Sequence, residues 1–319
     1  MYALRFTPAD LLRCRFAVST ALETLHAVRV LHDPRTQPMH LPWLRRALPH
    51  RPKFTRLIAL QPLRGWTPEF LAPAPGGPIT SMDEELAGIR SADPGFVREE
   101  LLRSAADQRE PALRRIALDL AEDPQEARRL LADELGLAWE LIVEPYWPQL
   151  SDLLDRDIAY HARLLAQGGL ESLASALDNA FSWRDGTLMI EHFTEDSYEL
   201  EGTGLVLMPS AFIWPNRAIG TGGPGLPAVM YAARGIAELW SRPAHPPEAL
   251  ERLLGRARAA LLLDLAEPAS TTALARRHGL SPSTVSAHLT VLKDAGLLAP
   301  RRDRRQVLYR RTSLGDLLV

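Results

Sequence analysis

The chain has 319 residues, of which 46% are hydrophobic and 24% charged, and its formal net charge is −2. This composition is typical of a globular protein with two or three domains. The single cysteine, Cys14, excludes an internal disulfide and a metal site built from several thiolates. No stretch is apolar enough to span a membrane and the N-terminus lacks a signal-peptide core, so we expect a cytoplasmic protein without a membrane partner.

The first elements are expected to be a short strand at Leu4–Phe6 and a long amphipathic helix from residues 7–10 to about His32. Apolar residues recur at helical spacing throughout this second stretch. They are Leu11, Leu12, Phe16, Ala17, Leu22, Leu25, Val28 and Leu31.

Residues 49–80 are rich in proline and glycine, which favours loop structure with one short element at Phe54–Leu60. Such a loop is long enough to cover a pocket. Successive helices are then predicted at Thr80–Ile89, Gly95–Gln108, Pro111–Ala121, Pro124–Val143, and from Pro145 to about Gln167, ending at Gly168–Gly169. Residues 1–185 are therefore predicted to be mainly helical.

From Thr187 the pattern changes to short apolar runs separated by turn residues, which indicates three to five strands. We expect a small antiparallel sheet over about 186–233 and a linker at 241–247. The prediction is a mostly helical α+β protein with a sensor or dimerisation domain over 1–240. Because Thr271–Leu298 has the spacing of a helix-turn-helix, residues 248–319 are predicted to form a DNA-binding domain.

Aromatic residues gather in the helical middle and the strand region, and most of them are expected in the core. A large domain joined to a DNA-binding domain nevertheless indicates a sensor, and aromatic side chains commonly line ligand pockets. We therefore expect a small hydrophobic ligand at a site formed by Trp139, Trp147, Trp183, Trp214 and Tyr231. A purely dimerising or protein-binding role for this domain is the alternative.

Three patterns suggest other chemistry, and each has a simpler interpretation. Residues 220–225 match G-x-G-x-x-G, but Pro224 stands where a phosphate cradle needs an N–H and no helix follows. Asp157 and His161 are spaced as half of a metal site, although a solvated pair on a helix is the favoured interpretation. His192 lies near several carboxylates, as acid–base catalysis requires, or ends a strand and pairs with Glu191 or Glu195. We expect no catalytic residue, metal or cofactor.

The C-terminal part, Thr271–Leu298, has the spacing of a helix-turn-helix. Gly279 separates two helical patterns, and Ser281 and Pro282 are typical of the start of the second. Val285, Leu289 and Leu292 share one apolar stripe of that second helix. The opposite face is small and polar, which suits insertion into a DNA major groove.

An arginine-rich hairpin follows, with strands expected at 297–302 and 306–311 around residues 303–305. Residues 270–319 hold nine Lys and Arg against three Asp and Glu, whereas the rest of the chain holds 28 against 36. Positive charge gathered beside a helix-turn-helix is typical of duplex binding.

The run SPSTVSAHLTVLKDAGLL resembles the signature of the arsenic-repressor-like (ArsR/SmtB-type) winged-helix regulators and extends over about the last 70 residues. The resemblance implies a homodimeric repressor with Ser283, Ser286 and Ala287 at the base-contacting positions. Ala287 departs from the longer polar residue common there, and Asp303–Arg304 replace the usual glycine of the wing turn. The N-terminal stretches DLLRCRFAVS, ETL and PWL resemble an uncharacterised regulator domain fused to such winged helices in GC-rich bacteria.

We therefore expect a homodimeric transcriptional repressor that binds double-stranded operator DNA and responds to a signal by changing the separation of its recognition helices. The residues expected to contact DNA are Ser281, Ser283, Thr284, Ser286, Ala287, Thr290, Lys293, Arg302, Arg304, Arg305, Gln306 and Arg310. Two alternatives stay open: a small-molecule enzyme that uses the winged helix only for dimerisation, and a protein-interaction module whose basic wing meets an acidic partner.

Overall fold

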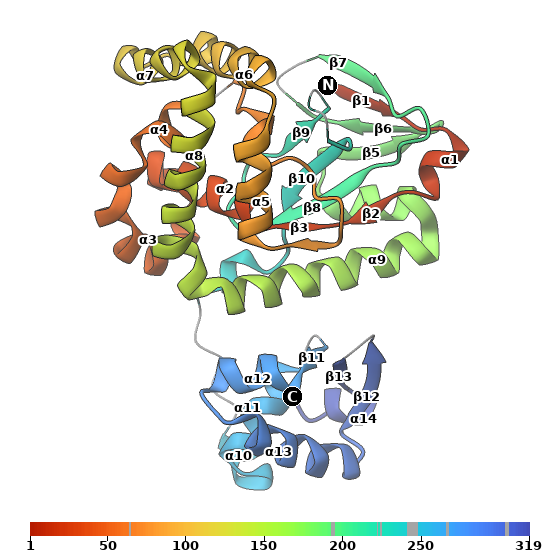
Figure 1. Cartoon of the computed structure of the whole chain (residues 1–319). Helices are drawn as coiled ribbons and strands as arrows, with labels where there is room; N and C mark the ends of the chain where they lie inside the picture. The colour runs from red at the N-terminus through yellow and green to blue at the C-terminus, as the bar shows by residue number, and fades with distance from the viewer. Residues whose placement is uncertain are drawn as a thin grey trace. The chain divides into compact units, whose positions relative to one another are not determined.

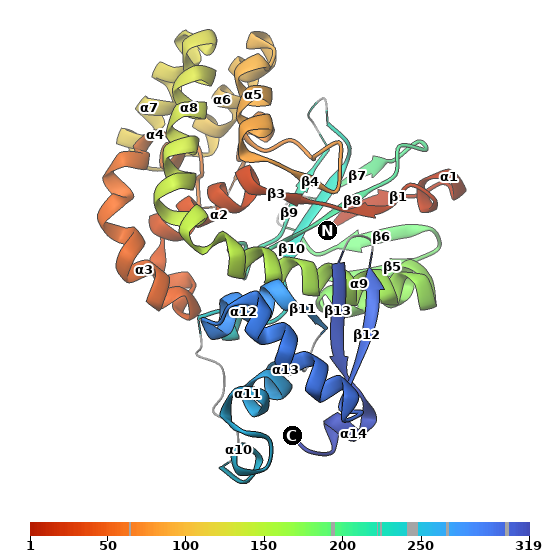
Figure 2. The same cartoon turned by 60° about the horizontal axis from the view of Figure 1, so that its bottom comes forward.

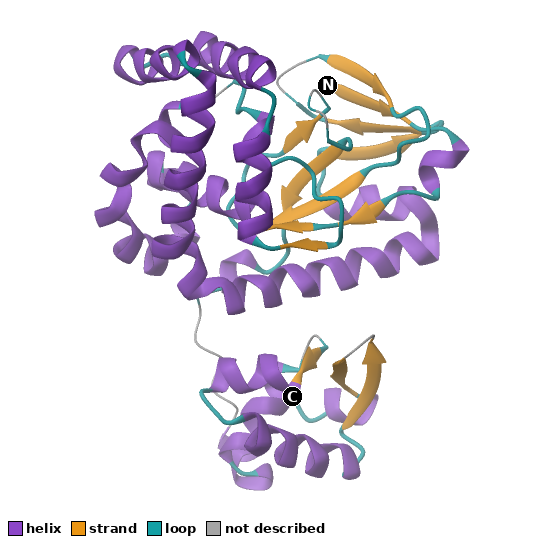
Figure 3. Cartoon of the chain, in the orientation of Figure 1, coloured by secondary structure: helices purple, strands orange, loops and turns teal. Residues whose placement is uncertain are grey.

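The computed structural model describes residues 1–63, 65–192, 195–221, 223, 225–240, 248–265, 268–303 and 306–319. The chain divides into two compact units, one of Met1–Trp147 with Leu153–Ile236 and one of Pro148–Asp152 with Ala237–Val319 (Figure 1). The linker predicted at 241–247 lies outside the described residues. The expected α+β, mostly helical class is confirmed, and Figure 3 separates the helices from the strands by colour.

The first unit contains most of the helices, and prolines mark several of their first residues. The α-helices are α1 (Pro8–Leu11), α2 (Thr20–His32), α3 (Leu41–Ala47), α4 (Thr55–Ala59), α5 (Met82–Ser91), α6 (Pro94–Asp107), α7 (Pro111–Glu122), α8 (Pro124–Ala138) and α9 (Trp147–Leu177). Short 3-10 helices are η1 (Pro34–Thr36), η2 (Pro38–His40), η3 (Leu48–Phe54), η4 (Glu69–Leu71), η6 (Glu144–Tyr146) and η7 (Ile236–Glu238), and η5 (Trp139–Val143) is a π-helical turn.

Helices α5 to α8 pack against one another, with α5 beside α8 and α6 beside α7 (Figure 2). Their starts follow from local chemistry. Asp93 and Asp123 accept hydrogen bonds from the backbone N–H groups of Phe96 and Glu126, and a proline with a preset φ follows each aspartate. This is why the predicted helix boundaries in this part of the chain agree closely with the structure.

The single helix predicted from residues 7–10 to His32 is wrong. Helix α1 ends after one turn, and the chain then forms β2 (Arg15–Phe16) and β3 (Val18–Ser19) before α2 begins. The N–H groups of Arg15 and Ala17 donate to the carbonyls of Leu205 and Leu207, so a distant strand supplies these hydrogen bonds. Leu12, counted in the apolar stripe, is 89% exposed. Tertiary pairing therefore overrides the local helical pattern.

The sheets of this unit are mixed, which corrects the predicted antiparallel sheet. One has the order β5–β6–β1–β7, where β1 runs antiparallel to β6 and parallel to β7. Another has the order β2–β8–β10–β9, where β8 runs parallel to both its neighbours, and β3 pairs with β4. The further strands are β1 (Tyr2–Arg5), β4 (Ile79–Thr80), β5 (Phe181–Arg184), β6 (Thr187–Ile190), β7 (Asp196–Glu199), β8 (Val206–Ser210), β9 (Ala218–Gly220) and β10 (Ala228–Ala232). Strands β1 and β2, both from the first 20 residues, thus complete sheets whose other members follow residue 180.

Helix α9 packs on this strand layer through Leu170 and Leu173, which join a core with Leu4, Ile190 and Val229. The helix is interrupted at Gly168 and Gly169, where the backbone leaves the helical region. The expected end at this glycine pair is therefore a kink, after which a second helical segment continues to Leu177.

Asp157 and His161 lie in the core, so the interpretation as a solvated pair is wrong. His161 Nδ1 lies 3.0 Å from Asp157 Oδ2. The same carboxylate accepts from the Tyr231 hydroxyl at 2.7 Å and from the Arg234 N–H at 2.8 Å. The buried carboxylate is thus satisfied by protein donors from α9 and from the end of β10, which fastens the helix to the sheet.

The second unit contains the shorter elements near the C-terminus. They are α10 (Glu248–Leu254), α11 (Arg256–Asp264), β11 (Ala269–Ser270), α12 (Thr271–His278), α13 (Pro282–Asp294), β12 (Leu298–Asp303), β13 (Gln306–Arg311) and α14 (Ser313–Asp316). The three strands form an antiparallel sheet of order β11–β13–β12. The core joins Leu261 and Leu262 of α11 to Leu274 of α12 and to the apolar stripe of α13.

Glu23 is an ionisable group enclosed in the first unit. Its carboxylate accepts from the Ala211 N–H at 3.1 and 3.2 Å, and burial raises the pKa of Glu23 to about 7. A raised pKa means that the folded state prefers the protonated acid. This preference is fully present below the ordinary glutamate pKa near 4.5 and is lost as the pH rises through 7.

We expect Glu23→Gln to remove most of this pH dependence, because glutamine still offers an acceptor to Ala211 but cannot ionise. As the pH rises from 5 to 8, the wild type should lose stability relative to the variant. The difference in the free energy of unfolding, variant minus wild type, should therefore increase by about 3 kcal/mol. Urea unfolding of the full chain at several pH values measures it, with Glu122→Gln on the exposed face of α7 as the control. Parallel pH curves for wild type and Glu23→Gln would contradict the assignment.

Candidate functional site

The turn between α12 and α13 has the geometry that a helix-turn-helix requires. Gly279 ends α12 in the left-handed conformation, with φ 65° and ψ 30°. The Leu280 N–H returns to the Ala275 carbonyl at 2.9 Å, which closes the helix end. Ala275 is buried where the two helices meet. The glycine is needed here because other residues rarely adopt this backbone conformation.

Helix α13 begins at a conventional cap and buries one apolar stripe. The Ser281 hydroxyl accepts from the Thr284 N–H at 3.1 Å, and Pro282 is the first helical residue. Val285, Leu289 and Leu292 are fully enclosed in the core of the unit. Because these three residues fix the rotation of the helix about its axis, they also determine which side chains it presents to solvent.

Seven of the side chains predicted to contact DNA lie on α13 or at its N-cap. Ser281, Ser283, Thr284, Ser286, Ala287, Thr290 and Lys293 are all exposed. Their hydroxyl groups differ in how they are used. Ser281 Oγ lies 2.8 Å from the hydroxyls of both Ser283 and Thr284, and Thr290 donates to the Ser286 carbonyl at 2.9 Å. The Ser286 hydroxyl makes no hydrogen bond among the described residues, so it is available to an outside partner.

The expected hairpin is present as β12 and β13, which pair from Leu298↔Arg311 to Asp303↔Gln306. Arg302 and Arg310 are exposed on this hairpin. Arg304 and Arg305, and the side chain of Gln306, lie outside the described residues. On α13, Lys293 forms a surface ion pair with Asp294 at 3.2 Å. The described part of the hairpin therefore adds exposed positive charge to the same unit as α13.

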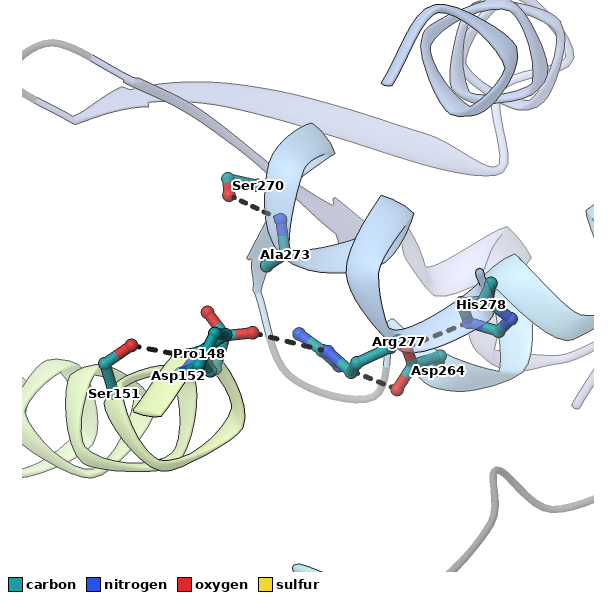
Figure 4. A network of polar contacts seen from close by, with 8 residues as sticks. All are labelled: Pro148, Ser151, Asp152, Asp264, Ser270, Ala273, Arg277 and His278. Carbon is teal, nitrogen blue, oxygen red and sulfur yellow. Dashed lines mark hydrogen bonds and ion pairs between the residues drawn. The ribbon is translucent and has the colours of Figure 1, made fainter. Parts of the chain in front are cut away.

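A network of polar contacts joins α11 to the end of α12 (Figure 4). Asp264 accepts from Arg277 at 2.7 Å and lies 3.0 Å from His278 Nε2. Arg277 Nε also lies 3.9 Å from Asp152, which belongs to the same unit. Burial acts to raise the pKa of Asp264, but the His278 hydrogen bond and the Arg277 charge outweigh it and hold that pKa below its usual value. The ionised carboxylate thus fixes the last turn of α12 ahead of Gly279.

We expect Asp264→Asn to destabilise the second unit by about 2 kcal/mol near pH 7, because it removes a partly buried charged partner of Arg277 and His278. The lowered pKa places this stabilisation above about pH 4 and predicts its loss as the pH falls further. Hydrogen exchange of the amides in 248–319 and thermal unfolding measure it. Asp294→Asn, at an exposed ion pair, serves as the control, and equal effects of the two substitutions would contradict the expectation.

The first unit contains a cavity of about 910 Å³. One face of α2, the loop that includes Trp66–Glu69, the ends of β6 and β7, and residues 213–230 contribute side chains to its wall. The volume is within the range of small-molecule sites. A proline-rich loop within 49–80 therefore does line a cavity, as its composition suggested.

The five aromatic residues predicted to bind a ligand are not among those that line this cavity. Trp139 packs against Trp147 with ring centroids 5.1 Å apart, and Trp183 packs against Phe6 at the same distance. Tyr231 is buried and donates to Asp157. Trp214 is 41% exposed. Packing within the fold accounts for four of the five, since large rings are placed where they bury most area.

The cavity is lined instead by residues whose role the sequence did not reveal. His26 and Arg29 come from α2, Gln61 follows α4, and Trp66 and Glu69 come from the loop. A usable signal was present in α2, because Leu22, Leu25, His26 and Arg29 recur at i, i+3, i+4 and i+7 and place polar groups on a helix that is otherwise almost wholly buried.

The glycine-rich run 220–225 meets a carboxylate at the cavity wall. The N–H groups of Thr221 and Gly223 donate to Glu69 at 3.2 and 2.8 Å. These are the kind of groups that would hold a phosphate in a nucleotide-binding loop. Since an acidic side chain already accepts from them, the run does not offer a phosphate cradle.

His192 also lines the cavity, beside Glu191 and Asp196. Its ring lies edge-on to Tyr2, with centroids 6.1 Å apart. Burial, together with the nearby N-terminal ammonium group, lowers the pKa of His192. Its carbonyl accepts from the N-terminal amine at 3.1 Å.

Comparison with known families divides the chain in two. A model described as a helix-turn-helix domain matches residues 253–301, and a model described as a family of unknown function (DUF5937) matches residues 69–234. The first match indicates a DNA-binding transcription regulator. No curated protein and no solved structure matches the chain. Within the described residues, every helix is too short or too polar to cross a lipid bilayer.

Proposed function

Because the chain belongs to the family of unknown function (DUF5937) and carries a helix-turn-helix domain, we propose that it is a cytoplasmic, homodimeric repressor of the arsenic-repressor type that releases or binds operator DNA in response to a small molecule. The observation that carries the proposal is the exposed serine-rich face of α13, which lies opposite its buried stripe and is followed by an arginine-bearing hairpin.

The two parts of this surface would do different work on DNA. The part of α13 that carries Ser283, Ser286, Ala287 and Thr290 is narrow and uncharged. It enters a major groove, where the Ser286 hydroxyl bonds to a base edge and Ala287 contacts a thymine methyl group. Arg302 and Arg310 of the hairpin bind phosphates, with Arg304 and Arg305 as further phosphate ligands predicted from the sequence. The α13 side chains thus recognise the base sequence of the DNA, and the hairpin arginines supply most of the binding affinity.

We expect Ser286→Ala to weaken binding to the operator roughly fivefold to tenfold and to leave binding to random DNA unchanged. The double substitution Arg302→Ala with Arg310→Ala should weaken both, and should reduce the slope of log affinity against log salt by about 0.9 for each phosphate that is no longer bound. Mobility shifts at several salt concentrations on the upstream region of its own gene measure both effects.

Arg114→Ala on the exposed face of α7 is the matched control for loss of positive charge. If the serine and the arginine substitutions acted alike on operator and random DNA, the division of roles would be wrong. If neither changed DNA binding, the basic hairpin would instead fit the alternative of an acidic protein partner.

Exposed apolar side chains support a homodimer. In the second unit Leu253, Leu314, Leu317 and Val319 are 68%, 53%, 84% and 43% exposed, although large apolar residues usually avoid water. An operator with two half-sites one helical turn apart, about 34 Å, also requires two identical subunits, one for each half-site. We propose that these side chains of α10 and the C-terminus meet their counterparts in a second copy.

We expect the wild type to elute with twice the 35.4 kDa mass of one chain and the double variant Leu253→Glu with Leu317→Glu to elute as a monomer. The introduced glutamates would be buried at the interface between the two subunits. There they would repel the glutamates of the other subunit and lose their hydration, so the dimer should dissociate. Light scattering after gel filtration measures the mass. Leu12→Glu, at a leucine 89% exposed in the first unit, is the control, and a variant that stays dimeric would exclude this interface.

An enzyme is the second candidate function, and the observation in its favour is that His192 lies in the cavity wall. We propose instead that the cavity binds a molecule without converting it, because two other candidate catalytic groups are poorly suited to catalysis. His26 lies 2.8 Å from the Ser210 hydroxyl, as a base beside a nucleophile would, but burial lowers the pKa of His26 to about 3, so it is a weak base. Burial also raises the pKa of Cys14 to about 11, which makes its thiol a poor nucleophile.

A further inference from the structure

We propose that the cavity of the first unit binds an amphipathic monocarboxylic acid, with its carboxylate on Arg29 and its apolar body along Leu22, Leu25 and Ile213. The inference rests on the proposed ligand response and adds the chemical class of the ligand and the residues that select it. It begins from the one face of α2 that reaches the cavity.

Among the described residues, Arg29 is a cation without an anionic partner. Its Nη2 donates to the Leu63 carbonyl at 2.8 Å, and within the described part of the chain no carboxylate lies within 4.0 Å of its guanidinium. Arg29 is half-buried, and this burial lowers the pKa of its guanidinium. A guanidinium presents a planar fork of N–H donors that matches a carboxylate, so a bound acid would supply the missing charge.

The other two cavity arginines are already engaged. The guanidinium carbon Cζ of Arg103 lies over the Trp66 ring, 3.4 Å from the ring centroid. Arg217 donates to the Glu191 carbonyl at 3.0 Å and to Asp178 at 3.4 Å. Among the arginines of the described cavity wall, Arg29 is therefore the one that a bound anion would stabilise most.

His26 and Gln61 add neutral polar groups to the same cavity wall as Arg29. His26 lies one turn earlier on α2, and its Nδ1 is held by Ser210, which leaves Nε2 for another partner. Gln61 is almost fully buried at the cavity wall, and its Nε2 has no hydrogen-bond partner among the described residues. A buried amide without a partner is costly, and a ligand oxygen at that place would remove the cost.

The remaining charges limit the ligand to a single negative charge. Glu69, Asp107, Glu191 and Asp196 also line the cavity. A phosphate ester or a dicarboxylate would bring a second negative charge toward these acids, which is unfavourable in a partly enclosed site. Leu22, Leu25 and Ile213 are buried and offer apolar surface to the rest of the molecule. A ligand with one carboxylate and an apolar body therefore matches both Arg29 and the apolar part of the cavity wall.

Two fluorescent probes of matching shape test the charge preference in the full chain without DNA. The anionic probe is 8-anilino-1-naphthalenesulfonate, and the neutral probe is N-phenyl-1-naphthylamine. We expect Arg29→Gln to weaken binding of the anionic probe at least tenfold and that of the neutral probe less than twofold. Arg29→Lys should restore part of the anionic binding, and Arg45→Gln on the exposed face of α3 should change neither. Equal weakening of both probes, or no effect of Arg29→Gln, would overturn the proposal.

A competition experiment on the wild type needs no variant and covers the case in which Arg29→Gln does not fold. Decanoate should displace the neutral probe at a concentration at least tenfold lower than decan-1-ol or decylamine. An equal effect of the three competitors, or preference for the amine, would overturn the carboxylate assignment. Neither experiment contains DNA, so both test the ligand site independently of DNA binding. If the wild type failed to bind DNA in a separate mobility shift, the proposed regulator would be rejected, but the ligand site would not.

Discussion

Three side chains on one face of α13, Val285, Leu289 and Leu292, are packed into the core of the second unit, and this packing controls the helix's other face. Rotating α13 about its axis would expose leucines and bury hydroxyl groups, both of which are unfavourable. The seven predicted DNA-contacting residues of this helix are exposed for that reason. Gly279 and the Asp264 network act on the same element, since they determine where α12 ends and α13 begins.

Helix α2 has a comparable position in the first unit. It buries residues on nearly every side, and it also presents His26 and Arg29 to a cavity. A charged residue on such a helix is costly unless another group meets it. In a molecule whose second unit is expected to bind DNA, the feature that best links the first unit to a sensing role is Arg29, which has no anionic partner in the described cavity wall.

The distribution of charge separates two kinds of anion recognition in one chain. The C-terminal 50 residues hold an excess of basic residues, many of them on an exposed hairpin, which suits the repeated phosphates of a duplex. Of the three arginines that line the described cavity wall, Arg103 and Arg217 already have partners, and Arg29, among acids and neutral groups, suits one carboxylate. The same residue type thus serves an extended polyanion in one place and a small anion in the other, because its surroundings differ.

Local sequence by itself determined the helix-turn-helix, its caps, its apolar stripe, the hairpin strands and most helix starts in 80–145, because caps, proline positions and 3.6-residue periodicity act within a few residues. Only the tertiary structure decided that residues 15–19 form strands, since their hydrogen-bond partners at Leu205, Leu207 and Pro78 are remote in sequence. It also decided which residues line the cavity. Tryptophans favoured by composition pack within the fold, whereas Arg29, Gln61 and Glu69 come together from three separate segments that no local pattern connects.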